Sequence, residues 1–215
     1  MSVLSSLLAR KPSRERPDLA SWIAGAAPVL VVDGLVDGVG TGSQFPGATV
    51  LPHVTSGGPG LPFHDRDPRR LAEKDGSMKA VVLLDVLDKV LDVGFAIDEA
   101  RRVLAPGGRL LVVQTVAPDG YEDRAIWNAL VRMRDPRHTW TATARQTAAM
   151  LSGYKMPQER EAEWEEAADP RATRRPDAAG SLGRMVDAAS GLAAGNVVRD
   201  GALVLVRRAF LLRRD

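Results

Sequence analysis

The sequence predicts an α/β protein with a Rossmann-like, doubly wound and mostly parallel sheet that ends in an antiparallel carboxyl-terminal hairpin. Three observations in the middle of the chain lead to this fold class. Residues 79–84 form a continuous apolar run, and residues 94–104 repeat apolar side chains at helical spacing. Residues 109–114 resume as an apolar run after a Pro-Gly-Gly sequence. A strand, a helix and a strand in this order form a right-handed crossover between parallel strands.

The first third of the chain predicts a short helix and two strands. Residues 18–24 have the apolar spacing of a short helix. Residues 28–32 are continuously apolar, as in a parallel strand covered on both faces, and Asp33 follows them. Residues 48–54 predict a second strand. Pro52 puts that strand at an edge or near its end, because proline cannot donate a ladder hydrogen bond.

Clear signals bound the central helix. One side of this helix is apolar and the opposite side is charged. Asp98 and Arg102 lie on the charged side at the spacing of an i,i+4 ion pair. Pro106-Gly107-Gly108 then stops the helix, because glycine supplies a left-handed cap and proline cannot continue the ladder. We therefore expect residues 79–84 and 109–113 to be adjacent parallel strands.

The rest of the chain, after residue 120, is long enough for several more helices and strands. Residues 122–133 and 143–151 predict two amphipathic helices. The acidic and arginine-rich stretches that follow predict a mobile or lid-like segment over residues 155–180. Residues 197–212 predict a β-hairpin with its turn at Asp200-Gly201.

Length and composition predict one domain. The chain has 215 residues, of which 45% are hydrophobic, which is enough for a core within residues 18–215. Residues 1–17, rich in Ser and Arg, are expected to be a tail, with a targeting peptide as the alternative. The sequence has no cysteine, which excludes disulfides and thiolate zinc sites. Its three histidines are too scattered for a metal centre, so we expect no metal.

Charge and hydropathy narrow the choice of partners. The chain has 29 Lys plus Arg against 27 Asp plus Glu, and its arginines are distributed rather than set in one stripe. We therefore expect no nucleic-acid partner. No apolar run approaches the roughly 18–20 residues that a membrane span requires, so we expect no membrane partner and a cytoplasmic location. The sequence predicts no particular oligomeric state.

Residues 75–113, DGSMKAVVLLDVLDKVLDVGFAIDEARRVLAPGGRLLVV, resemble the central segment of the class I S-adenosylmethionine-dependent methyltransferases. In that family the segment holds the fourth strand, a helix, the Pro-Gly-Gly turn and the fifth strand. Leu61-Pro62-Phe63 resembles the family's element before this segment. Residues 134–138, RDPRH, and residues 200–203, DGAL, resemble parts of a ubiquinone-biosynthesis-like branch.

The resemblance implies a seven-stranded sheet that binds S-adenosylmethionine and an acceptor at the carboxyl ends of its strands, where doubly wound sheets bind ligands. It assigns cofactor binding to five residues: Asp33, Gly34, Gly38, Gly40 and Gly42. The chain departs from the family at several points. Its GxGxG is displaced along the chain, and the second predicted strand ends near His53 without a carboxylate for the ribose. Gly60 stands where the family often has an acidic residue, and the first and second predicted strands are close together in the sequence. The alternative for the three later glycines is a flexible surface turn.

The resemblance also implies residues on the acceptor side. Asp85 follows the fourth strand and is a candidate catalytic base if its pKa is raised by burial between apolar walls. The alternative is a turn cap. His138 is the second catalytic candidate and is expected to share one pocket with Asp85, with a surface loop position as the alternative. Arg134 and Trp127 are candidate substrate-binding residues, although Trp127 also suits a core position.

These expectations lead to two hypotheses of function. The first is methyl transfer from S-adenosylmethionine to a small-molecule acceptor, aromatic or polyketide-like, in secondary metabolism. Such a reaction depends mainly on positioning, because the sulfonium is already a strong electrophile. The alternative is a methyltransferase-fold protein that has lost methyl transfer and acts as a cyclase-like biosynthetic protein or a non-catalytic binding partner. The displaced glycines and the missing ribose carboxylate favour this alternative.

Overall fold

The structure of the protein is a computed structural model that describes residues 15–34, 44–51, 67–135, 137–168, 181, 184–186 and 197–215. Its centre is a seven-stranded sheet in the order β2-β1-β3-β4-β7-β5, with β6 paired to β7. The strands are β1 Val29–Asp33, β2 Thr49–Leu51, β3 Met78–Leu84, β4 Leu104–Val116, β5 Gln158–Ala168, β6 Val198–Arg199 and β7 Ala202–Arg213. Strands β1 to β4 are parallel, and β7 is antiparallel to its neighbours. The predicted fold class is confirmed.

The central crossover follows the prediction. Strands β3 and β4 are adjacent and parallel, and helix α3 (Val93–Val103) connects them. β4 already begins at Leu104, so the Pro-Gly-Gly sequence lies inside the strand, with Gly107 at φ 73°. The predicted pairing of Arg102 with Asp98 is wrong, because the Arg102 guanidinium reaches Glu99 at 2.8 Å and also Asp75.

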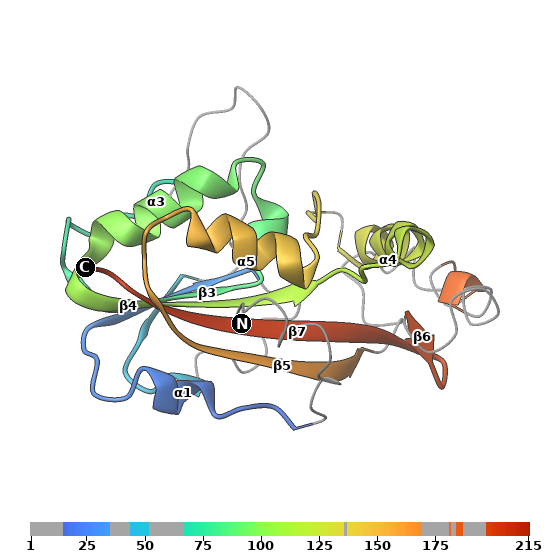
Figure 1. The fold of residues 1–215 in the computed structure, drawn as a ribbon, viewed down its shortest axis with the longest axis horizontal. Coiled ribbons are helices and arrows are strands. Elements are labelled where there is room, and N and C mark those ends of the chain that lie inside the picture. Colours follow the sequence, from blue (N-terminus) through green and yellow to red (C-terminus); the bar gives the residue numbers. More distant parts are fainter. Residues whose placement is uncertain are drawn as a thin grey trace, which may run out of the picture.

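Helices cover both faces of the sheet (Figure 1). α3 and α5 (Ala144–Ser152) lie on one face, and α1 (Leu19–Trp22) lies on the other. α4 (Tyr121–Arg134) lies over the end of the sheet formed by β6 and the start of β7, and a 3-10 turn, η2 (Leu87–Lys89), follows β3. Of the described helices, none is long and apolar enough to cross a membrane.

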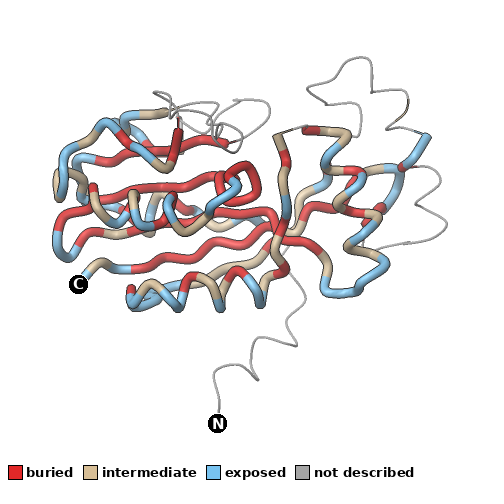
Figure 2. The backbone as a smooth tube through the Cα atoms, turned by 90° about the horizontal axis from the view of Figure 1, so that it is seen from above, coloured by how far each residue is buried: buried red, intermediate tan, exposed pale blue. Residues whose placement is uncertain are grey.

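Two apolar layers sandwich the sheet, and the alternation of side chains along each strand builds them. Leu110 and Val112 of β4 pack with α3, whereas Leu111 and Val113 pack with Leu19 on the α1 side. Figure 2 shows the central strands buried along most of their length. A third, smaller apolar cluster joins α4 to β6 and β7.

The predicted mobile segment over residues 155–180 is wrong for residues 158–168. These residues form β5, which pairs with β7 along its whole length. The reason is charge pairing across the strands: the buried Arg208 of β7 contacts Glu161 at 2.8 Å and Glu163 at 2.7 Å. Acidic residues that favour a solvated segment when read alone are therefore neutralised inside a sheet. Residues 169–180 lie outside the described residues.

The other predicted elements divide between confirmed and undescribed ones. The structure contains the predicted short helix, the two later helices and the hairpin. Asp200 and Gly201 form the turn of the hairpin, with φ 51° and 73°. β2 is an edge strand parallel to β1, as predicted, but shorter. Residues 1–14 of the predicted tail, the loop at residues 37–42 and the segment at residues 52–62 lie outside the described residues. The last residues of the tail, 15–17, are described.

Candidate active site

Buried polar side chains gather at the carboxyl ends of β1, β3 and β4. Asp33 ends β1, Asp85 follows β3, and Gln114 and Thr115 lie near the end of β4. Gln114 and Thr115 are successive strand residues, so their side chains point to opposite faces of the sheet. Each binds a different carboxylate, and two separate clusters result.

The first is the Asp85 cluster, which consists of Asp85, Thr115, Glu166 and Arg207. One Asp85 carboxylate oxygen accepts hydrogen bonds from the Thr115 backbone N–H at 2.8 Å and from its hydroxyl at 3.0 Å. The other oxygen lies 2.9 Å from Nη1 of the buried Arg207. The expectation of apolar walls around Asp85 is therefore wrong. Its carboxylate is a buried partner in an ion pair, with both oxygens engaged.

The second is the His138 cluster, which consists of Asp88, Lys89, Gln114, Asn128, His138 and Thr141. Its centre is Asp88: Oδ2 lies 2.9 Å from His138 Nδ1 and 2.9 Å from Lys89 Nζ. Gln114 donates to Oδ1 at 2.9 Å. Burial alone would raise the pKa of Asp88, but the Lys89 charge and the hydrogen bond from His138 hold that pKa well below its ordinary value.

The ring of His138 is held on every side, and its side chain has no exposed area. Because the ionised Asp88 faces Nδ1, that nitrogen carries a proton. Nε2 lies 3.0 Å from the Thr141 hydroxyl and 3.2 Å from Oδ1 of Asn128. Asn128 donates its amide N–H to the Arg124 carbonyl, which turns Oδ1 toward the ring.

A chain of charges connects this cluster to the end of β1. Arg137 Nη2 donates to the Gly34 carbonyl at 2.9 Å and to Asp135 at 2.7 Å. Asp135 in turn lies 3.9 Å from Lys89, which contacts Asp88. Burial would raise the pKa of Asp135, but hydrogen bonding to Arg137 and the Lys89 charge lower it. The loop that carries His138 is thus fixed to the strand that the resemblance assigns to the cofactor.

The structure separates the two predicted catalytic residues. Asp85 binds Thr115 and Arg207, whereas His138 binds Asp88, which binds Gln114 on the other face. The prediction that Asp85 and His138 face one pocket therefore finds no support in their contacts.

The predicted substrate-binding residues differ in access. Trp127 is a core residue with 1% of its surface exposed. Its indole N–H donates to the Val204 carbonyl at 3.2 Å, and its ring meets that of His138 edge-on at 6.0 Å between centroids. It supports His138 rather than lining an open surface. Arg134, the last residue of α4, is half-buried.

Part of the predicted cofactor set lies in described residues. Asp33 is buried at the end of β1, and Gly38, Gly40 and Gly42 lie outside the described residues. A Cβ added to Gly34 would overlap the backbone carbonyl of Asp85, so contact between the ends of β1 and β3 already requires a glycine there. Of the described residues, the acidic Asp33 fits the chemistry of a cationic cofactor, whereas Gly34 is explained by packing.

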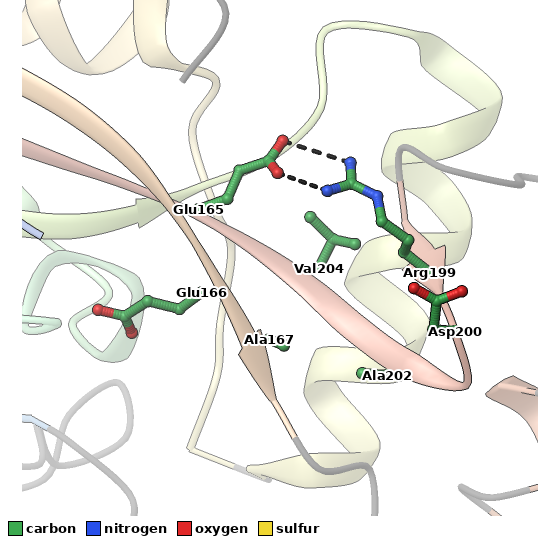
Figure 3. A pocket seen from close by; sticks show the side chains of 7 residues that line it. All are labelled: Glu165, Glu166, Ala167, Arg199, Asp200, Ala202 and Val204. Atoms are coloured by element: carbon green, nitrogen blue, oxygen red, sulfur yellow. Dashed lines mark hydrogen bonds and ion pairs between the residues drawn. The ribbon is translucent and has the colours of Figure 1, made fainter. Parts of the chain in front are cut away.

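Two clefts lie among the described residues. One, of about 300 Å³, lies at the hairpin end between Glu165, Glu166, Arg199 and Asp200, where Glu165 and Arg199 form an ion pair at 2.6 Å (Figure 3). The other is small, about 20 Å³, and lies beside the His138 cluster; Asp88, Gln114 and Thr141 are among its lining residues.

Sequence reasoning missed Asp88, Lys89, Asn128 and Thr141. Asp88 follows Asp85 by three residues, and both come just after β3, so position along the chain does not distinguish them. Only the partners do, and Arg207 and His138 are remote in sequence from both aspartates.

Residues 48–112 match the family model described as methyltransferase domain. These residues include β2, β3, α3 and the start of β4. Comparison with curated protein sequences gives no match.

Solved structures match over most of the chain. A candidate methyltransferase from Bacillus halodurans is 17% identical with a TM-score of 0.64, over 91% of this chain and 97% of its own. The cyclase SpnF is 17% identical with a TM-score of 0.55, over 91% and 79%. The geranyl diphosphate C-methyltransferase of Streptomyces coelicolor is 16% identical with a TM-score of 0.52, over 92% and 78%.

These comparisons establish the fold. The chain has the fold of the class I methyltransferases, and its central segment carries the sequence pattern of their methyltransferase domain. The resemblance to that family is confirmed. The narrower resemblance to a ubiquinone-biosynthesis-like branch is not.

Proposed function

We propose that the protein transfers a methyl group from S-adenosylmethionine to a hydroxyl group of a small-molecule acceptor. The observation that carries the proposal is the 2.9 Å contact between Asp88 and His138 just beyond β3. This edge of a doubly wound sheet is where such folds bind ligands. A histidine whose Nδ1–H is held by a carboxylate has the arrangement of a general base.

The cofactor would be held on the side of β1. Asp33 is the described residue suited to it, because a buried carboxylate attracts a cation. When bound, S-adenosylmethionine supplies a methyl group on a sulfonium sulfur that leaves as a neutral thioether. The contact of Arg137 with the Gly34 carbonyl fixes the end of β1 relative to the loop of His138. That contact therefore keeps the two halves of the site in register.

The two candidate catalytic residues receive different roles. His138 accepts the acceptor's proton, and its charged ring would be stabilised by Asp88 at Nδ1 and by Asn128 Oδ1 at Nε2. Asp85 is a positioning residue, because Arg207 and Thr115 already occupy both of its oxygens. It holds β7 against the ends of β3 and β4. Proton removal of this kind contributes typically about 100- to 10,000-fold to a rate.

The first experiment is binding of the cofactor. Thermal unfolding with S-adenosylmethionine or S-adenosylhomocysteine at about 100 times its dissociation constant should show about 2.7 kcal/mol of stabilisation. Asp33→Asn should weaken binding, and Asp98→Asn, at an exposed position of α3, is the matched control. Transfer of labelled methyl to a panel of hydroxylated small molecules then tests the reaction. If neither ligand raises the melting temperature, the proposal is wrong.

A second candidate is a protein of this fold that binds a small molecule without methylating it. The similarity to the cyclase SpnF motivates it. So does the Gly34 carbonyl, which the Arg137 guanidinium already occupies. The observation that separates the two is the product mass: methyl transfer adds one methyl group, whereas a cyclisation leaves the mass unchanged. Binding of S-adenosylmethionine without release of S-adenosylhomocysteine would favour this second candidate.

A further inference from the structure

The two edges of the sheet are built differently. β2, at one edge, has 3 residues and is followed by Pro52, which cannot donate a ladder hydrogen bond. β5, at the other edge, has 11 residues, about twice the common strand length, and contains no proline or lysine. The register shift in its pairing lies at its start, between Gln158 and Arg160. Short edge strands, proline and lysine normally prevent pairing between sheets, so β2 is protected in a way that β5 is not.

The charges along β5 do not close this edge either. Within the described residues β5 pairs with β7 alone, so its outer row of backbone groups has no strand beside it. The exposed Arg160 faces the ring of Trp22 at 6.0 Å to the centroid and has no carboxylate partner in the described part of the chain. The glutamates of β5, in contrast, are each neutralised by an arginine of β4, β6 or β7: Glu159 by Arg109, Glu161 and Glu163 by Arg208, Glu165 by Arg199, and Glu166 by Arg207.

Two copies of β5 complement each other in one antiparallel register. A two-fold axis perpendicular to the sheet at Glu163 places Arg160 opposite Glu166 of the second copy, and by symmetry this pair occurs twice. Both side chains belong to the α1 side of the sheet, and 35% of the Glu166 side chain is exposed. Opposite charges at facing positions stabilise an antiparallel pair. Shifting the register by two residues would put Trp164 or Ala168 opposite Arg160 instead, so the charges select this register.

We infer that the protein forms a two-fold symmetric dimer in which the β5 strands of two copies pair in this register and join two sheets into one. Backbone hydrogen bonds between the strands hold the copies together, and the two pairs of Arg160 with Glu166 fix the register. The two copies of Glu163 meet at the axis, but each brings Arg208 with it at 2.7 Å, which compensates the like charges. The inference does not depend on methyl transfer, because β5 carries no residue of the His138 cluster.

Sedimentation equilibrium of the full chain tests the dimer, which should have twice the 23.1 kDa mass of the chain. Arg160→Glu and Glu166→Arg each place like charges opposite one another at two positions, so each should raise the dimer dissociation constant at least about tenfold. An equimolar mixture of the two variants should form a heterodimer as tightly as the unaltered protein, because both contacts then join opposite charges. Asp98→Arg, at an exposed position of α3, is the matched charge control and should leave the dimer unchanged.

Cross-linking tests the register, since the chain has no cysteine of its own. Glu163→Cys should form a disulfide with its own copy under mild oxidation, because facing Cβ atoms lie about 4.5–5.5 Å apart, whereas Asp98→Cys should not. If Glu166→Arg fails to fold beside Arg207, then Arg160→Glu and the cysteine variants still decide. A monomer at about 1 mM would overturn the dimer and leave this edge to a strand of another protein. A dimer insensitive to Arg160→Glu, or equal cross-linking of the two cysteine variants, would overturn it as well.

Discussion

The two clusters at the carboxyl edge of the sheet each contain a buried aspartate, but the partners of the two aspartates differ. In the Asp85 cluster, Arg207 and Thr115 use both carboxylate oxygens, and the charge is closed within the protein. In the His138 cluster, Asp88 is also held by buried partners, but one of them is a histidine. Under the proposed function, the buried carboxylate of one cluster holds strands together and that of the other supports a histidine base.

The largest expected effect is on turnover. His138→Gln keeps a donor for Asp88 but removes the basic nitrogen, so methyl transfer should fall roughly 100- to 10,000-fold. Unfolding in urea should show a much smaller change in stability. Initial rates with a hydroxylated acceptor measure the effect. Full activity of this variant would put proton transfer elsewhere.

The next largest effect is on stability and comes from removing a charge from the Asp85 cluster. Asp85→Asn leaves the buried Arg207 with Glu166, 3.7 Å away, as its remaining charge partner among the described residues, which should cost up to about 3–5 kcal/mol. The double variant Asp85→Leu with Arg207→Met removes both charges and should regain most of that loss. Urea unfolding of the three proteins measures it. A double variant as unstable as the single one would mean that the ion pair is not the reason.

A third prediction concerns acid. The pKa of Asp88 is lowered in the folded protein, so the stability it contributes is present above its unfolded pKa of about 3.9 and is lost as the pH falls below that value. Lys89→Met removes a charge that lowers this pKa, while His138, Gln114, Asp135 and Arg137 remain around it. The stability that Asp88 contributes at neutral pH should then be smaller, and so should the loss on acidification, because its onset is set by the unfolded pKa, which the variant does not change. Unfolding curves from about pH 2 to about pH 7 measure the difference.

The smallest effect belongs to an exposed pair. Glu165 and Arg199 are joined at 2.6 Å, but 41% of the arginine side chain is exposed. Glu165→Gln should change stability by about 0–1 kcal/mol, because water screens such pairs. Set beside Asp85→Asn, it tests whether burial rather than distance makes the difference. A loss as large as that of Asp85→Asn would contradict this view.

The sequence predicts helices and strands well where neighbouring residues alone determine them. The crossover from β3 through α3 to β4 is visible as two apolar runs and a helical repeat. β5 is not visible in the same way, because its glutamates resemble a solvated segment until Arg208 of β7 is placed beside them. A pattern cannot reveal a partner that lies some 45 residues further along the chain.

The same limit applies to the site. Asp85 and His138 were within reach of the sequence because one follows a strand and the other lies in a motif-like element. Their partners Arg207 and Asp88 were not, and the partners decide their roles. The arginines at 207 and 208 are buried and paired with carboxylates.

Strand β7 follows every other strand in the sequence yet lies between β4 and β5 in the sheet. During synthesis β4 can already pair with β3, but β5 leaves the ribosome before the strand that joins it to the sheet, with its glutamates uncompensated. Asp85 likewise waits for Arg207. Pairings between distant segments slow folding. The Asp85 cluster is thus complete only after β7 has joined the sheet.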